Sequence, residues 1–155
     1  MTDLQEFLRA GAVAAALVAP NKKTLFQQLA AMADTAYGID AGVVVEKLTE
    51  RERLGSTGFG AGIAIPHGKV EGLADVVGVF VRLAQPVDFA SIDDEPVDLV
   101  FMLLSPVDAG AAHLKALAHV SRVLRDRSFV AKLRGAATDD ALFALFSTGE
   151  TRDAA

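Results

Sequence analysis

Four short apolar runs are spaced along the first two thirds of this chain, with segments of helical spacing between and after them. The runs cover residues 12–19, 63–65, 76–83 and 97–104. Runs of this length that are rich in Val, Ile, Leu and Phe are typical of buried strands. The first run is rich in Ala and would also suit a helix, and we favour a strand there. Strands that alternate with helices predict an α/β fold.

Helical spacing marks five segments. In the first of them Leu25 and Leu29 lie on one face, because residues three or four apart are neighbours on a helix surface. Asp40 and Asp108 are expected to be N-caps, since a carboxylate accepts hydrogen bonds from the free amides of a first turn. The expected helices run over 22–36, from Asp40 to Gly55, over about 109–125, from Ser128 and from near Thr138.

These elements predict a mixed β-sheet of about five strands with helices on both faces. A chain of 155 residues, 52% of them hydrophobic, has the length and the apolar content of one domain. We therefore expect residues 1–148 to form a single domain. Residues 149–155 are expected to be a flexible C-terminal tail.

The net charge of −5 argues against nucleic acid as the main partner, because phosphate backbones are bound by clustered Lys and Arg. The start of the chain lacks the positive charges of a secretory signal, and the apolar run from Gly11 to Pro20 is too short to span a bilayer. We expect a cytoplasmic protein without membrane insertion. The densest basic group is interrupted by apolar residues and is expected to form a solvated helix face (Arg122, Arg125, Arg127, Lys132 and Arg134).

Several common active-site motifs are missing. The chain has no cysteine, which excludes disulfides, thiolate zinc sites and cysteine nucleophiles. A P-loop would need glycine at position 63, where Ile63 stands, and a dinucleotide-binding loop would need glycine at position 65, where Ile65 stands. There is no Gly-x-Ser-x-Gly elbow and no His-Glu-x-x-His helix. The hydrolase and nucleotide-binding classes therefore lose their main support.

Three histidines remain as candidates for chemistry. His113 shares the apolar stripe of its helix and is expected to face inward, whereas His119 is expected to meet solvent on another face. A three-histidine zinc site is formally possible, but His113 and His119 point to different sides of their helix, so we expect no metal. We also expect no cofactor. His67 is placed differently, because it is expected to end an apolar strand between Pro66 and Gly68. Such a position is rigid and open, although a surface or turn histidine remains the alternative.

Residues 51–69, RERLGSTGFGAGIAIPHGK, resemble the phosphorylation-site segment of the enzyme IIA domains of the bacterial phosphotransferase system, in the mannitol/fructose class. Residues 96–104, PVDLVFMLL, and residues 113–126, HLKALAHVSRVLRD, are similar to later segments of the same family. The resemblance covers most of the chain and is closest to the nitrogen-regulatory branch. It implies the mannitol-type enzyme IIA fold.

The resemblance also implies roles for individual residues. His67 matches the histidine that is phosphorylated by an HPr-type phosphocarrier, here the nitrogen-branch HPr. His113 matches the second active-site histidine, and Arg51 matches the arginine of the Arg-Glu pair before the Gly-Ser-Thr segment. Ala61 departs from some sugar-transporting relatives, which have a carboxylate or amide six residues before the acceptor. Any hydrogen bond that this group makes is absent here.

Phosphoryl transfer depends mainly on positioning and on charge stabilisation, so donors are needed around the phosphoryl oxygens. The Ser56 and Thr57 hydroxyls and the backbone amides of the glycine-rich segment, including Gly68, are expected to bind the phosphoryl group. A cap or turn role for Ser56 and Thr57 is the alternative. The acceptor imidazole must be neutral, and an ordinary pKa of about 6.5 already allows this. By the family pattern its proton is expected on Nδ1, held by a backbone carbonyl, with Nε2 free to attack.

Three functions fit this site. The first is a regulatory phosphocarrier that binds target proteins, such as sensor kinases or transporters, according to its phosphorylation state, since a phosphoryl group adds about −1.5 to −2 charges. The second is a sugar-specific enzyme IIA that passes phosphate to a separate EIIB; the lack of a B-domain cysteine and of a membrane domain in this chain favours the first. The third is a binding domain that has lost phosphotransfer, which the presence of His67, His113 and Arg51 argues against.

Overall fold

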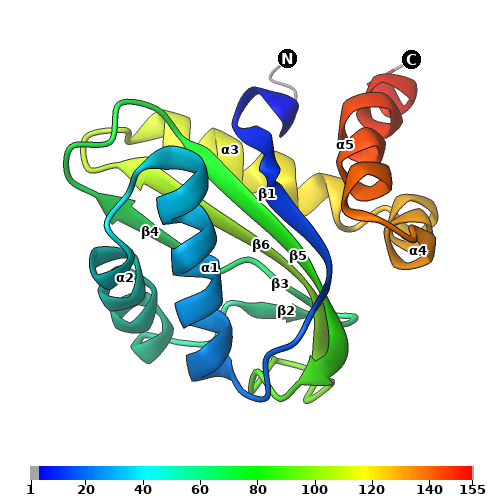
Figure 1. Ribbon diagram of the computed structural model, residues 1–155, viewed down its shortest axis with the longest axis horizontal. Helices are drawn as coiled ribbons and strands as arrows, with labels where there is room; N and C mark the ends of the chain where they lie inside the picture. Colours follow the sequence, from blue (N-terminus) through cyan, green and yellow to red (C-terminus); the bar gives the residue numbers. More distant parts are fainter. Residues whose placement is uncertain (1–3, 155) are drawn as a thin grey trace.

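A mixed sheet forms the centre of the computed structural model, which describes residues 4–154, with side chains up to Ser147 apart from Gln5 (Figure 1). In these residues six strands have the order β1-β5-β6-β3-β2, and β4 also pairs with β6. β5 and β6 are antiparallel, whereas β1 is parallel to β5, and β3 and β4 are parallel to β6. The strands are β1 (Leu8–Leu17), β2 (Gly58–Gly60), β3 (Ile63–Ala64), β4 (His67–Val70), β5 (Val77–Val87) and β6 (Val97–Pro106).

Helices cover both faces of the sheet, as predicted. α1 and α2 lie in front of it in Figure 1 and α3 lies behind it, while α4 and α5 follow α3 towards the β1 side. Asp40 caps α2 as expected, because its Oδ2 accepts a hydrogen bond from the amide of Val43 at 3.0 Å. The helices are η1 (Leu4–Glu6, a 3-10 turn), α1 (Lys22–Tyr37), α2 (Ala41–Arg53), α3 (Ala111–Val123), α4 (Arg127–Gly135) and α5 (Asp139–Ala154).

β6 is the central strand and is buried along almost its whole length. A strand with neighbours on both sides and helices on both faces needs a continuous apolar run, which residues 97–104 supply. Phe101 of β6 and Phe80 of β5 pack against Phe146 of α5, with ring centroids 5.8 Å and 4.8 Å from it. Edge-on aromatic contacts of this kind stabilise a core beyond the area that they bury. β6 therefore provides a rigid support for β4 and for the helix that follows it.

Two local predictions were wrong. Asp108 is not the N-cap of α3, because the amide of Ala109 donates a hydrogen bond to the carbonyl of Pro106, which closes a turn there, and Gly110 takes the cap position. The strand expected over 63–65 is β3, which has only two residues, so His67 does not end it. Pro66 has no N–H to donate to a ladder, and pairing with β6 resumes at His67, which begins β4.

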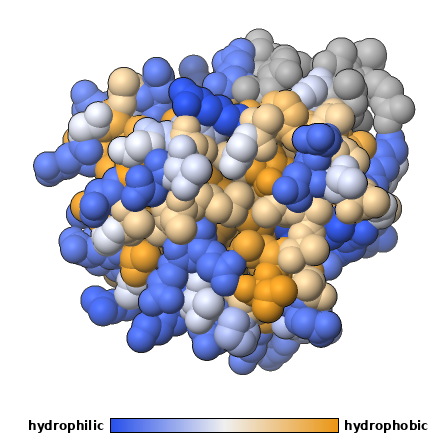
Figure 2. Space-filling model, in the orientation of Figure 1, coloured by the Kyte–Doolittle hydropathy of each residue, from blue (hydrophilic) through white to orange (hydrophobic). Residues whose placement is uncertain are grey.

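The face of the molecule seen in Figure 1 has both apolar and hydrophilic regions on its surface. Figure 2 shows apolar residues across its middle and hydrophilic ones around its rim, and the alanine-rich α1 and β1 lie there. Small exposed apolar residues are normal on a protein surface. Within residues 4–154 no helix has the length and hydropathy needed to cross a bilayer. The flexible tail at 149–155 stays a prediction, because the side chains after Ser147 and all of residue 155 lie outside the described residues.

Candidate active site

Two histidines far apart in the sequence meet at one end of β6. His67 begins β4 and is in register with Leu103 of β6, while His113 comes from the first turn of α3, just after β6 ends. Their ring centroids lie 5.6 Å apart, with the ring planes tilted by 49°. His113 is buried, as predicted, and His67 is partly exposed. The sheet therefore brings together the two histidines that the sequence singled out.

Arg51 joins this pair from the last turn of α2. Its Nε donates to Nε2 of His67 at 3.3 Å, and its Nη1 donates to the carbonyl of Gly55 at 2.9 Å. The helix can come this close because position 68 has no side chain. A Cβ built on Gly68 would lie 3.1 Å from the Cβ of Lys47 on α2. Gly68 thus permits the packing of α2 on β4 that puts Arg51 beside the imidazole.

The contacts of His67 determine which of its nitrogens carries the proton. Nδ1 lies 2.8 Å from the carbonyl oxygen of Ile65, which can only accept, so Nδ1 must donate. Nε2 receives the N–H of Arg51 and so holds a lone pair. This is the tautomer expected from the family pattern. A neutral imidazole with a lone pair on Nε2 is a nucleophile.

The surroundings keep both rings neutral. Burial lowers the pKa of His67 below its ordinary value of 6.5; the hydrogen bond to Ile65 opposes this, the charge of Arg51 reinforces it and the charge of Glu52 opposes it. Burial also lowers the pKa of His113, and the charge of Lys69 and the charge that His67 would carry if protonated act in the same direction. Removing a histidine from water and placing cations beside it both disfavour the imidazolium form. Both rings therefore favour the neutral form at neutral pH.

Ser56 and Thr57 use their hydroxyl hydrogens inside the protein. Ser56 Oγ donates to the carbonyl of Phe89 at 2.8 Å and accepts from the amide of Gly58 at 3.1 Å. Thr57 Oγ1 donates to Glu52 Oε1 at 2.7 Å. A hydroxyl has one hydrogen to donate, so these two match the cap or turn alternative. Phosphoryl binding by backbone amides of this segment stays a prediction.

Glu52 is a residue that sequence reasoning left without a role, although it is the second member of the Arg-Glu pair. Its carboxylate accepts from both the amide and the hydroxyl of Thr57, at 3.0 Å and 2.7 Å, and pairs with Lys22 Nζ at 2.8 Å. Lys22 belongs to the first turn of α1 and also lies 4.2 Å from the ring centroid of Phe89. Glu52 thereby ties α1, α2 and the segment after Arg51 into one unit.

Ser105 is a second site residue to which the sequence analysis gave no role. It is fully buried near the end of β6, and its Oγ lies 2.6 Å from Nδ1 of His113. The available signal was a lone polar residue at the end of a continuous apolar run.

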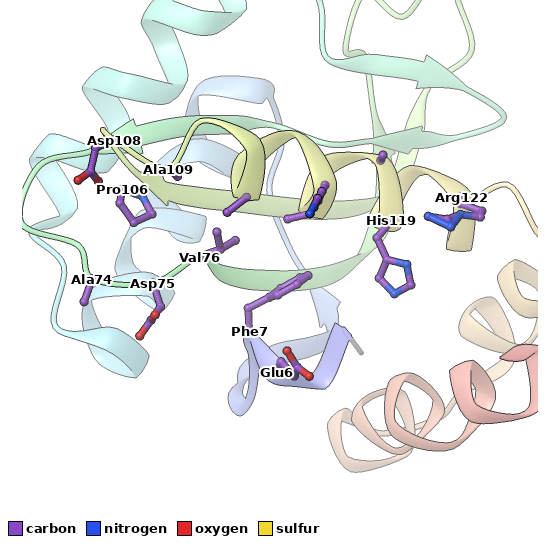
Figure 3. Close-up of a pocket in the computed structure, with 14 residues that line it drawn as sticks. Glu6, Phe7, Ala74, Asp75, Val76, Pro106, Asp108, Ala109, His119 and Arg122 are labelled. Carbon is purple, nitrogen blue, oxygen red and sulfur yellow. The ribbon is translucent and has the colours of Figure 1, made fainter. Parts of the chain in front are cut away.

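The expectation that His119 meets solvent was wrong. His119 is only 8% exposed, and it points into a surface cavity of about 830 Å³ that Phe7, Glu6 and Arg122 also line (Figure 3). Glu6 and Phe7, which line the cavity together with His119, come from the segment that leads into β1, and helical spacing alone does not reveal that they lie on this side of α3. His67 and His113 do not line this cavity. In the described part of the chain no cluster of three His, Asp or Glu side chains is arranged to hold a metal ion.

Comparison with known proteins gives consistent matches. The model of the family described as "Phosphoenolpyruvate-dependent sugar phosphotransferase system, EIIA 2" matches residues 6–149. The nitrogen regulatory protein of Bradyrhizobium diazoefficiens is 46% identical over 136 residues, which are 88% of this chain and 89% of that protein. That of Escherichia coli is 40% identical over 131 residues, 84% of this chain and 80% of that protein. The crystal structure of the nitrogen regulatory protein IIA-Ntr from Neisseria meningitidis has a TM-score of 0.84 and 32% identity, covering 91% of this chain and 97% of that one.

Proposed function

Because this chain belongs to the EIIA 2 family of the phosphoenolpyruvate-dependent sugar phosphotransferase system, we propose that Nε2 of His67 accepts a phosphoryl group from an HPr-type carrier and that the phosphorylated protein acts as a cytoplasmic regulator. Family membership confirms the resemblance and the fold inferred from the sequence. The observation that carries the site assignment is the tautomer of His67. Its Nδ1–H group is held by the Ile65 carbonyl and its Nε2 lone pair faces the Arg51 guanidinium.

Transfer would proceed by attack of this lone pair on phosphorus. A new bond forms between Nε2 and phosphorus while the phosphorus–nitrogen bond of the donor breaks, and its electron pair stays on the donor nitrogen. The positive charge that develops on the His67 ring is stabilised by the hydrogen bond from Nδ1 to Ile65. Arg51 is already beside Nε2 and can move its donors onto the phosphoryl oxygens, where a fixed cation has most effect. His113, whose ring centroid lies 5.6 Å from that of His67, supplies a second group.

Exposed apolar residues next to the site segments support a protein as the donor. Leu54 follows the Arg51 turn and is 84% exposed, Leu114 follows His113 and is 65% exposed, and Val107 is 51% exposed just after β6. Large apolar side chains that remain in contact with water near a polar centre are typical of surfaces that bind another protein. A carrier that docks here would bury them as its phosphohistidine reaches His67.

The regulatory output is proposed from the relatives that are called nitrogen regulatory proteins. Phosphorylation would place about −1.5 to −2 charges at the rim of the sheet. On that basis the partner would be a target protein, such as a sensor kinase or a transporter, that binds one form of the site and not the other. A pull-down with wild type, His67→Ala and His67→Glu tests this, since equal recovery of every partner by all three would contradict the proposal.

The phosphorylation step is tested by intact-mass measurement after incubation with phosphoenolpyruvate, enzyme I and an HPr-type carrier. Wild type should gain one phosphoryl group, which acid treatment removes, and His67→Ala should gain none. His119→Gln is the control, because this histidine lies outside the site and faces a separate cavity. The proposal fails if wild type gains no mass, or if His67→Ala gains as much as wild type.

A further inference from the structure

We infer that Ser105 is a positioning residue that holds His113 in the tautomer with its proton on Nε2, ready to donate to the phosphoryl group. This inference rests on the proposed function of His67. Ser105 lies near the end of β6 and has no exposed surface. Its Oγ is 2.6 Å from Nδ1 of His113, and both groups are buried. A contact so short between a hydroxyl and a ring nitrogen is a hydrogen bond.

The direction of this bond follows from what each group has left to donate. If His113 Nδ1 carried the proton, the hydroxyl of Ser105 would accept a hydrogen bond from it. The hydroxyl would then need another acceptor for its own hydrogen. Among the described residues Ser105 Oγ makes no other hydrogen bond. The hydroxyl hydrogen would then be buried without a partner, which is unfavourable. The arrangement that satisfies both groups has Ser105 donating to a lone pair on Nδ1.

A neutral imidazole with a lone pair on Nδ1 carries its hydrogen on Nε2. Within the described part of the chain no acceptor is bound to Nε2 of His113, so this hydrogen is available to a phosphoryl oxygen. The other tautomer would present a lone pair to an anionic group and would repel it. The two rings, 5.6 Å apart, thus have complementary tautomers: His67 offers a lone pair on Nε2 and His113 offers a hydrogen on Nε2.

The test is the ¹⁵N spectrum of histidine-labelled protein, recorded at a pH where the rings are neutral. The two ring nitrogens of a neutral imidazole have well-separated ¹⁵N shifts, so the spectrum reports which of them is protonated. Wild type should show His113 as the Nε2–H form, and Ser105→Ala should shift it towards a mixture of the two forms. The matched control is Ser91→Ala, because Ser91 is also buried and its Oγ has no hydrogen-bond partner among the described residues. Ser91→Ala should leave the His113 signals where they are.

The same variants are then compared for the rate of phosphoryl transfer from an HPr-type carrier. Ser105→Ala should be slower by about fivefold to tenfold, the value of one ordinary hydrogen bond, with Ser91→Ala at the wild-type rate. An Nδ1–H form of His113 in wild type would overturn the inference, as would an unchanged rate in Ser105→Ala despite a shifted spectrum. The spectrum needs no phosphoryl donor, so it can support or reject the Ser105 contact even if wild type proves unable to accept phosphate.

Discussion

The Nε–H group of Arg51 donates a hydrogen bond to Nε2 of His67 at 3.3 Å, so the guanidinium lies beside the nitrogen that we propose accepts the phosphoryl group. This contact orients the lone pair and adds a positive charge beside it. The charge lowers the pKa of His67, in the same direction as burial. After transfer the same cation would be next to an anion. Arg51 therefore serves the acceptor both before and after phosphorylation without a large rearrangement of the backbone.

Replacing Arg51 by Ala should slow phosphoryl transfer by about 100-fold, because removal of one donor that stabilises developing charge has an effect of this size. Arg51→Lys should recover little of the rate, since an ammonium lacks the planar fork of the guanidinium. Arg53→Ala is the matched control, as Arg53 is exposed two residues further along the chain. Rapid-quench measurement of transfer would contradict the assignment if the Arg51 and Arg53 variants were equally fast.

The two histidines should make the stability of the protein depend on pH. The pKa of each is lowered in the folded state, so the unfolded chain binds more protons as the pH falls below about 6.5. The two histidines should therefore leave the free energy of unfolding unchanged above that pH and should lower it as the pH falls below that value. Urea unfolding over a pH series should show a smaller decrease in His67→Gln and His113→Gln. An identical pH profile in all three proteins would show that neither ring contributes.

Glu52→Ala should lower the free energy of unfolding by about 1–3 kcal/mol, because the buried amide and hydroxyl of Thr57 lose their acceptor. Transfer should slow as well, since Glu52 ties down the segment that follows Arg51. Glu50→Ala, at an exposed position on the same helix, should change stability by less than about 0.5 kcal/mol. Urea unfolding of the two variants side by side is the measurement, and a Glu52 effect no larger than that of Glu50 would argue against the network.

Gly68→Ala should slow transfer and destabilise the protein, because its new methyl group would lie 3.1 Å from the Cβ of Lys47 and 3.6 Å from its backbone carbon. The neighbour is rooted in α2, so α2 must move and carry Arg51 away from His67. Gly135→Ala is the control, since a Cβ there would meet no atom within 4 Å apart from those of its neighbours and of its own helix backbone. It should be neutral or stabilising by up to about 1 kcal/mol. Wild-type transfer by Gly68→Ala would mean that α2 does not need this close approach.

Much of the fold could be predicted from the spacing of apolar residues. The errors arose where a residue's surroundings depend on segments outside its own helix. Apolar periodicity located the helices and the long strands β5 and β6, because a helix or strand must bury one face whatever it packs against. His119 was misplaced because its own helix face is polar, with Arg122 nearby, while the cavity that it lines is also bounded by Phe7 from a distant segment. Asp108 was misplaced because the turn after β6 leaves Gly110, and not the aspartate, at the start of α3.

The local order of residues was sufficient to make His67 a candidate and to predict that His113 faces inward, since both depend on near neighbours in the chain. The resemblance to the family added Arg51. The chemistry of the site depends on groups that the chain brings together only after folding. The carbonyl of Ile65 and the guanidinium of Arg51 select the tautomer of His67, and Ser105, on the central strand, meets His113. Hydrogen bonds act over about 3 Å, so the protonation of each ring is set by atoms in space and not by its neighbours in sequence.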